Sequence, residues 1–158
     1  MTDADRLAQL ADQEERLQFT KFDNETALAL GAQLLAAARE RGLPVTISVR
    51  RNGQRLFHAA LPGTSADNDA WIDRKSRVVD RYGHSSFLIG TQFRAKGGSF
   101  EEDSRLNPDE YAAHGGVFPV LVRGVGPVGT VGVSGLPQAD DHAFVVEQLE
   151  RFLADYAK

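Results

Sequence analysis

The sequence predicts an α+β fold in which two β-hairpins form one antiparallel sheet flanked by helices. Two pairs of segments alternate apolar and polar residues, and each pair is joined by a turn that contains glycine. Segments with helical spacing of apolar residues precede, separate and follow these pairs. The chain has 158 residues, a length that favours a single domain over 1–158.

The amino-terminal segment, residues 1–18, contains a short amphipathic helix at residues 3–17 in this prediction. Leu7, Leu10, Ala11 and Glu14 recur there at helical spacing.

A second helix is predicted from about residue 24 to 41, because the stretch ALALGAQLLAAARE is rich in helix-forming residues. Asp23 or Asn24 can cap its start, and Gly42 follows its end. We expect Leu28, Leu35 and Ala38 to face the core.

The first hairpin follows at VTISVRRNGQRLFHAAL. Val45, Ile47 and Val49 alternate onto one face, and Asn52-Gly53 is a sequence typical of a two-residue turn. The chain then enters a third predicted helix, with Thr64, Ser65 or Asp67 as candidate caps and with Gly83 after its last turn. Its apolar face is expected to comprise Trp71, Ile72, Lys75, Val78, Val79 and Tyr82.

The middle of the chain gives weaker signals. SSFLIGTQFR is compatible with a strand or with a helix, and AKGGSFEEDSR is expected to be a polar loop. Asn107-Pro108-Asp109-Glu110 is predicted to begin a short helix that ends at His114.

The second hairpin is predicted from FPVLVR and VGTVGVSG, and a final helix from about Asp140 to Tyr156. Between the two strands lies GVGPVG, which matches the glycine pattern of dinucleotide-binding loops. That pattern binds a pyrophosphate only where a helix follows it directly. Here a strand follows, so we expect a turn and no nucleotide.

Composition excludes several function classes. The net charge of −4 argues against nucleic acid or an anionic membrane as a partner. The chain has no cysteine, which excludes disulfides and thiolate ligands and fits a reducing compartment. Its first residues are acidic and lack the apolar core of a secretory signal, and no apolar run is long enough for a membrane helix, so the expected location is cytoplasmic.

Several segments together resemble a known family. RRNGQRLFHAALPGTSADNDAWIDRKSRVV, HSS, YAAHGGVFPV and GPVGTVGVSGLPQADDH are similar to the haem-degrading-domain family of the GlcG/HbpS type, and to its branch of small uncharacterised cytoplasmic proteins. The resemblance covers about residues 20–157. It implies an antiparallel sheet with flanking helices, similar to profilin or to sensor domains, together with a homo-oligomer and an association with haem.

Two histidines and a serine are candidate ligand-binding residues. His114 ranks first, because it stands beside two glycines that would let a ligand approach the backbone; the alternative is a histidine that stabilises a helix end. His84, which precedes two serines, ranks second, and Ser134 lies in the VGVSG strand. None of the histidines has metal-site spacing, so no metal is predicted.

Arg50 and Arg51 precede the first hairpin turn. An arginine there could bind a carboxylate or a haem propionate, although solvation of the sheet edge is the simpler interpretation.

Three functional hypotheses remain open. The first is a cytoplasmic, homo-oligomeric binding domain for haem or another small anionic ligand, with its pocket near His114. The second is an enzyme that acts on a small metabolite and uses His114 or His84 as a general acid or base; its catalytic residues are unknown. The third is a non-catalytic protein-interaction scaffold.

Overall fold

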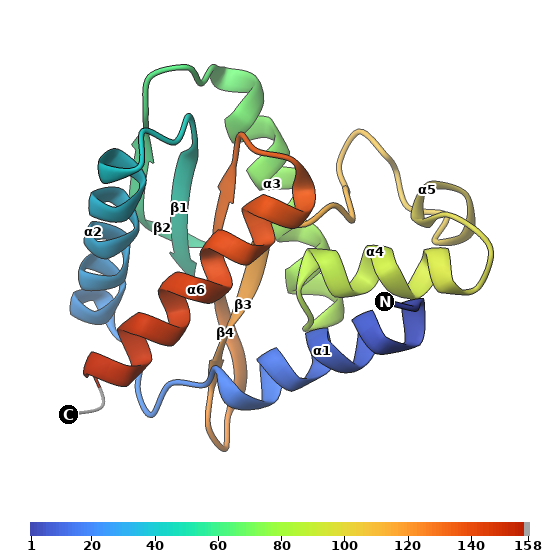
Figure 1. Cartoon of the computed structure of the whole chain (residues 1–158), viewed down its shortest axis with the longest axis horizontal. Coiled ribbons are helices and arrows are strands. Elements are labelled where there is room, and N and C mark those ends of the chain that lie inside the picture. The colour runs from blue at the N-terminus through green and yellow to red at the C-terminus, as the bar shows by residue number, and fades with distance from the viewer. Residues whose placement is uncertain (157–158) are drawn as a thin grey trace.

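One four-stranded sheet lies at the centre of the protein, which we describe for residues 1–156 from a computed structural model (Figure 1). The strands are β1 (Thr46–Arg51), β2 (Gln54–Ala60), β3 (Val117–Val122) and β4 (Gly126–Ser134). Their order is β2-β1-β4-β3, and every neighbouring pair is antiparallel. The α+β fold with two hairpins predicted from the sequence is therefore confirmed.

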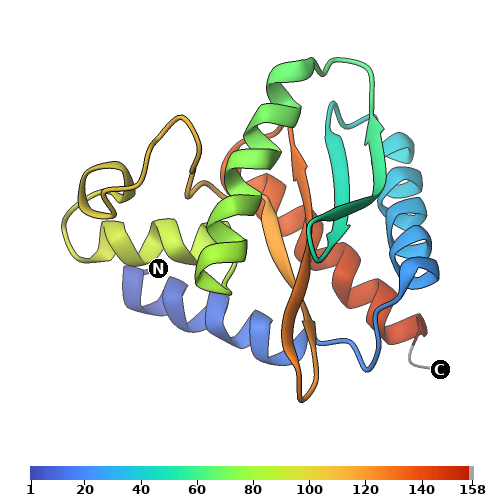
Figure 2. The ribbon, with the colours of Figure 1, turned by 180° about the vertical axis from the view of Figure 1, so that it is seen from behind.

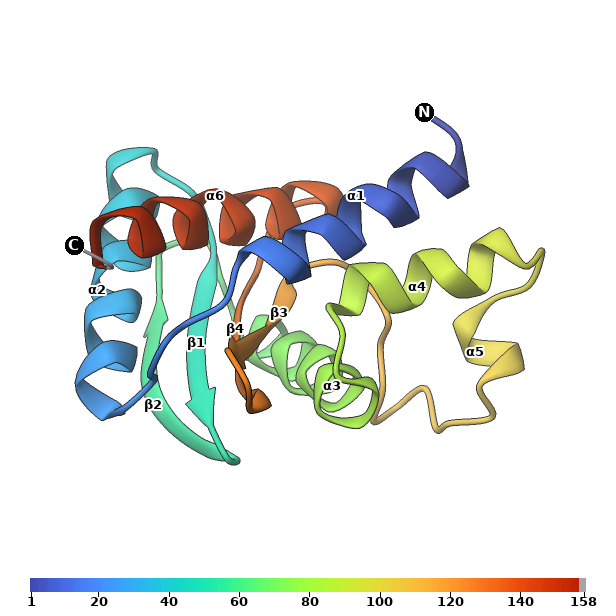
Figure 3. The same ribbon diagram turned by 90° about the horizontal axis from the view of Figure 1, so that it is seen from below.

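Helices cover both faces of this sheet. They are α1 (Asp3–Arg16), α2 (Asn24–Glu40), α3 (Ala66–Tyr82), α4 (Ser86–Ala95), α5 (Phe100–Asp103) and α6 (Gln138–Tyr156). Figure 1 shows α2 and α6 in front of the sheet, and Figure 2, seen from behind, shows α3 on the opposite face. The helices α1, α4 and α5 extend beyond the β3 edge, where α1 and α4 lie side by side (Figure 3). None of the helices within residues 1–156 combines the length and apolar character that crossing a bilayer requires.

The first hairpin forms as its sequence predicts. Asn52 and Gly53 have φ angles of 50° and 82°, the positive values that a two-residue turn of this kind needs. Val45, Ile47 and Val49 are all fully buried. They pack into a core with α2, α6 and the inner strands.

The glycine pattern GVGPVG lies at the second hairpin. Residues 123–125 form the turn, and β4 begins at Gly126, so a strand follows the glycines. Pro127 pairs with Leu121 inside the sheet, so the turn predicted for GVGPVG does not include its proline.

Helix α2 turns part of its predicted face to the core: Ala38 is fully buried and Leu35 packs against the core, but Leu28 does not. Leu28 is 44% exposed, whereas Leu30 and Leu34 are fully buried. The prediction for Leu28 was wrong because this helix contains many alanines, so its sequence permits several adjacent apolar faces.

The middle segment differs from its prediction in two places. Residues 86–95, compatible with either element, form the helix α4, and the expected polar loop contains the short helix α5. The helix predicted from Asn107 is absent: residues 108–110 form a turn, closed by the Asp109 N–H bound to Asn107 Oδ1 at 2.9 Å. The chain then runs extended because Ala112 donates its N–H to the carbonyl of Arg74 on α3. His114 therefore ends no helix.

Candidate functional site

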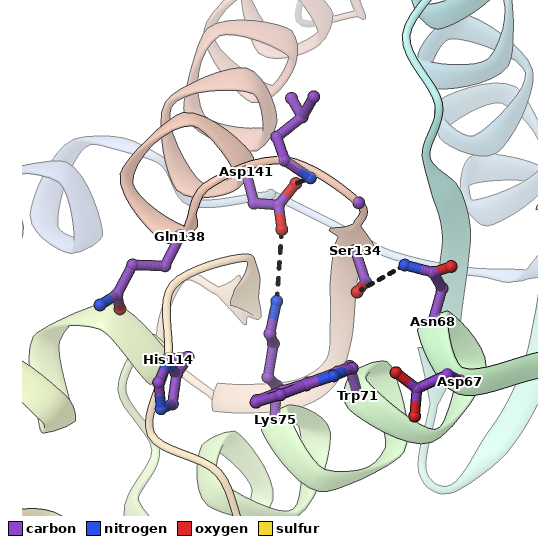
Figure 4. Close-up of a pocket in the computed structure, with 10 residues that line it drawn as sticks. Asp67, Asn68, Trp71, Lys75, His114, Ser134, Gln138 and Asp141 are labelled. Atoms are coloured by element: carbon purple, nitrogen blue, oxygen red, sulfur yellow. Dashed lines mark hydrogen bonds and ion pairs between the residues drawn. The ribbon is translucent and has the colours of Figure 1, made fainter. Parts of the chain in front are cut away.

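A polar pocket of about 260 Å³ lies between α3, the end of β4 and the start of α6. Its walls include Asn68, Trp71, Lys75, His114, Ser134 and Asp141 (Figure 4). We call it the Lys75 pocket. It collects residues from three parts of the chain that are far apart in sequence.

Lys75 and Asp141 form an ion pair at the base of this pocket. Lys75 Nζ lies 3.4 Å from Asp141 Oδ2, and the side chains are only 4% and 2% exposed. Burial lowers the pKa of Lys75 and raises the pKa of Asp141 to about 6, because it removes the water that would stabilise the charged form of each group. The charge of each group partly offsets the pKa shift of the other.

The surrounding backbone fixes this pair in place. A Cβ on Gly116 would lie 2.7 Å from Lys75 Nζ and 2.6 Å from the carbonyl oxygen of Val133, so only glycine leaves room for the amine. Asp141 Oδ1 accepts the N–H of Leu136 at 3.0 Å. That bond holds the carboxylate against the loop between β4 and α6.

Asn68 and Ser134 form the side of the pocket nearest the start of α3. Asn68 Oδ1 accepts the N–H of Ser65 at 2.9 Å in the capping box of α3. Its Nδ2 therefore faces Ser134 Oγ, at 3.5 Å. Because the capping box uses Oδ1 of Asn68, the Nδ2 group of the same amide faces the pocket.

Trp71 and His114 form an aromatic wall. Their ring centroids lie 5.2 Å apart in an edge-on arrangement, and the Arg74 guanidinium stacks 4.4 Å from the indole. His114 Nε2 lies 3.8 Å from Glu101 Oε1. Burial is the main cause of the lowered pKa of His114, which favours a neutral imidazole.

A second hollow of about 600 Å³ lies between α1, the junction of α3 and α4, and the second hairpin. We call it the His84 groove. Leu7, Ala11, Leu88, Leu121 and Pro127 give it a largely apolar lining, with His84 and Glu14 among its polar residues.

His84 is held in the groove by a carboxylate. Its Nδ1 lies 2.6 Å from Glu14 Oε1, and Glu14 Oε2 accepts the N–H of Ser85 at 3.1 Å. The Glu14 side chain is only 10% exposed, whereas that of His84 is 50% exposed. A hydrogen bond from Nδ1 to a carboxylate leaves Nε2 as the free nitrogen of the ring.

The candidate ligand-binding residues proposed from the sequence lie at different places in the structure. His114 and Ser134 line the same pocket, whereas His84 lies in the separate groove. Arg50 forms a short ion pair with Asp73 on α3. Arg51 donates to the carbonyl of Phe22 at 3.4 Å, and neither arginine lines the pocket or the groove.

Two further histidines lie outside these sites. His58 pairs with Asp69 at 2.6 Å. His142 is buried beside Phe87 and Phe118, and its Nε2 lies 2.7 Å from Gln13 Oε1. Within residues 1–156, no three side chains of the metal-binding types come together as a metal site.

Sequence reasoning missed Lys75, Asp141 and Glu14 as functional candidates. Lys75 was placed among apolar residues on the inner face of α3, and Glu14 on the inner stripe of α1. A charged residue on a predicted buried face was the available signal, since such residues are buried only when they are paired. Their partners could not be named because they lie 66 and 70 residues away.

Comparison with known proteins relates most of the chain to one family. A family model described as "Haem degrading protein HbpS-like" matches residues 22–150. A UPF0303 protein of Streptomyces coelicolor is 62% identical over 152 residues, which are 96% of each chain.

Two solved structures share the fold. The Ybr137w protein is 34% identical with a TM-score of 0.87, over 94% of this chain and 88% of that one. A structure described as a PduOC:heme complex is 15% identical with a TM-score of 0.65, over 82% of this chain and 93% of that one.

Proposed function

The chain belongs to the HbpS-like family of haem degrading proteins, and on this basis we propose that it binds haem in the His84 groove, where His84 would hold the haem iron. The observation that carries the proposal is the hydrogen bond between His84 Nδ1 and Glu14 Oε1 at 2.6 Å. Histidines that bind a metal commonly donate their other ring N–H to a carboxylate in this way, which fixes the tautomer and strengthens the ligand.

The donor chemistry of the groove fits haem. Histidine is a usual axial ligand of haem iron, and half of the His84 side chain is accessible. The apolar residues Leu7, Leu88 and Leu121 offer contacts for a porphyrin face. When bound, haem would supply an iron centre for electron transfer or oxygen chemistry.

Size favours the groove over the Lys75 pocket. Cofactor sites usually measure about 300–1,000 Å³. The groove, at about 600 Å³, falls within this range, whereas the pocket, at about 260 Å³, falls below it. A solved haem complex with the same fold supports haem as the ligand.

We also propose that the protein acts as a cytoplasmic homo-oligomer. Leu28, Val125 and Tyr156 are large apolar residues with exposed fractions of 44%, 72% and 46%, and side chains of this type are buried in subunit interfaces. The absence of cysteine fits a reducing compartment. Light scattering coupled to size exclusion would measure the assembled mass, and a monomer would contradict the proposal.

Titration of the purified protein with haem, followed by the Soret band, tests the binding proposal. We expect a saturable, stoichiometric spectrum for the wild type and a changed band with weaker binding for His84→Ala. His114→Ala, in the Lys75 pocket, and His58→Ala, outside both sites, should behave like the wild type.

Two results would contradict this assignment. An unsaturable response that is the same in all variants would mean that the protein has no specific haem site. A spectrum altered by His114→Ala but unaffected by His84→Ala would move the site to the Lys75 pocket.

A further inference from the structure

We propose that the Lys75 pocket binds a small organic monocarboxylate, with the Lys75 ammonium and the Ser134 hydroxyl as its hydrogen-bond donors. This binding site is separate from the His84 groove and does not depend on haem. The two sites share no lining residue.

The first argument is an excess of hydrogen-bond donors in the pocket. An ammonium group carries three N–H donors, yet within residues 1–156 Lys75 Nζ has a single hydrogen-bond partner, Asp141 Oδ2. Ser134 Oγ is approached by the Asn68 amide at 3.5 Å, so its own O–H is available to donate. A buried ammonium with unused donors is costly, and a ligand with acceptor oxygens would relieve that cost.

Three of the side chains that line the pocket have their acceptor oxygens engaged. Asp141 Oδ1 accepts from Leu136 and Oδ2 accepts from Lys75. Asn68 Oδ1 is bound to the N–H of Ser65, and Gln138 Oε1 accepts from the N–H of Gly115 at 2.9 Å. The pocket therefore offers free donors more than free acceptors, which selects a ligand rich in acceptors.

The charges select a monoanion. Lys75 and the nearby Arg74 are cationic, but Asp141 and Asp67 also line the pocket, and Glu101 lies beside His114. These carboxylates would repel a phosphate dianion more strongly than a monocarboxylate. A carboxylate can also bridge two donors with its two oxygens.

The dimensions select a small molecule. The volume of about 260 Å³ is below the ~300 Å³ at which sites for drug-sized ligands begin. Trp71 and His114 supply a flat aromatic wall against which a short carbon chain can pack.

Trp71 provides a direct measurement, because it is the only tryptophan in the chain and it lines the pocket. We would titrate the protein with propionate, with the neutral isostere propionamide, and with inorganic phosphate, and follow the tryptophan fluorescence. The expected result is a saturable change with propionate that is at least about tenfold weaker with propionamide, because the amide lacks the charge that pairs with Lys75. Phosphate should bind more weakly than propionate.

Variants connect the response to the named donors. Lys75→Met alone would leave Asp141 buried without its cation, so Lys75→Met combined with Asp141→Leu removes the pair as a unit. This double variant and Ser134→Ala should each weaken propionate binding, the former by about tenfold or more. Lys96→Met, which removes an exposed lysine that does not line the pocket, is the matched control and should bind as the wild type does.

The proposal would be overturned by any of three results: a linear, unsaturable fluorescence change; equal affinity for propionate and propionamide; or undiminished binding by the folded double variant. Tighter binding of phosphate would overturn the choice of a monocarboxylate. Circular dichroism of every variant establishes that a loss of binding does not reflect a loss of fold.

Discussion

Lys75 on α3 and Asp141 in the first turn of α6 form an ion pair across 3.4 Å with almost no solvent exposure. The two helices lie on opposite faces of the sheet (Figures 1 and 2). The pair therefore joins the two helical layers at the end of β4 and also forms the base of the Lys75 pocket.

Removing one partner of this pair should destabilise the protein more than removing both. Lys75→Met leaves a buried carboxylate without its cation, and such changes cost about 3–5 kcal/mol of unfolding free energy. Adding Asp141→Leu should recover much of that loss, because no uncompensated charge remains. Urea unfolding of the single and double variants measures the difference; equal stability of the two would show that the charges are solvated and uncoupled.

Two buried groups give opposite pH dependences of stability. Burial lowers the pKa of His142 from 6.5 to about 4. Its contribution to the free energy of unfolding is therefore present above pH 6.5 and is lost as the pH falls toward 4. Burial raises the pKa of Asp141 from 3.8 to about 6. Its contribution to the free energy of unfolding is therefore present below pH 3.8 and is lost as the pH rises through 6. In the wild type these two effects largely cancel.

His142→Phe should expose the Asp141 effect. This variant keeps a ring against Phe87 and Phe118 but cannot be protonated. Between pH 4 and 7 its unfolding free energy should fall by about 3 kcal/mol relative to that of the wild type, because the other titrating groups are common to both proteins. Parallel pH profiles of the two proteins in urea unfolding would rule out titration of His142 as a source of the pH dependence.

Glu14→Gln tests how the carboxylate acts on His84. The amide keeps the size of the side chain and loses the charge, so the imidazole becomes a weaker ligand. We expect haem affinity to fall by about 10-fold or more, the usual effect of removing such an outer partner. Glu15→Gln, a neighbouring carboxylate that also lines the groove, is the control. Equal losses in both variants would indicate a general charge effect.

Arg50→Ala should reduce stability without affecting ligands. Its side chain is 18% exposed and pairs with Asp73 on α3, which ties β1 to that helix. After allowance for partial solvent exposure, the expected loss is roughly 1–2 kcal/mol of unfolding free energy. Arg55 is half-exposed and lies farther from Asp73, so Arg55→Ala should reduce the unfolding free energy by less. Weaker haem or propionate binding by folded Arg50→Ala would instead give Arg50 a role in binding.

Features specified by neighbouring residues could be predicted from the sequence. The turn at Asn52-Gly53, the cap at Ser65 and the left-handed Gly83 after α3 all depend on residues within one turn of chain. The alternation that buries Val45, Ile47 and Val49 is equally local.

Features that depend on distant partners could not be predicted in the same way. The helix expected after Asn107 has suitable end signals, but Ala112 bonds to Arg74 on α3 instead. The partners of Lys75 and His84 are likewise fixed by folding, across 66 and 70 residues. His114 and Ser134 were found separately, because each lies beside a glycine; the sequence did not reveal that they share a pocket.

Gly90 gives a last prediction, because α4 supports the segment that carries His114. A Cβ on Gly90 would lie 2.1 Å from the carbonyl oxygen of Ala113. In an exposed helix Gly→Ala stabilises by about 1 kcal/mol, but here the overlap is with backbone that cannot rotate away. Gly90→Ala should therefore lower the unfolding free energy by about 1–3 kcal/mol and displace His114 from Trp71, which tryptophan fluorescence would detect. Gln92→Ala, an exposed change on the same helix, should remain within about 0.5 kcal/mol of the wild type. A stabilised Gly90→Ala would mean that the 112–114 segment can move away from α4, so that the position of His114 would not depend on this contact.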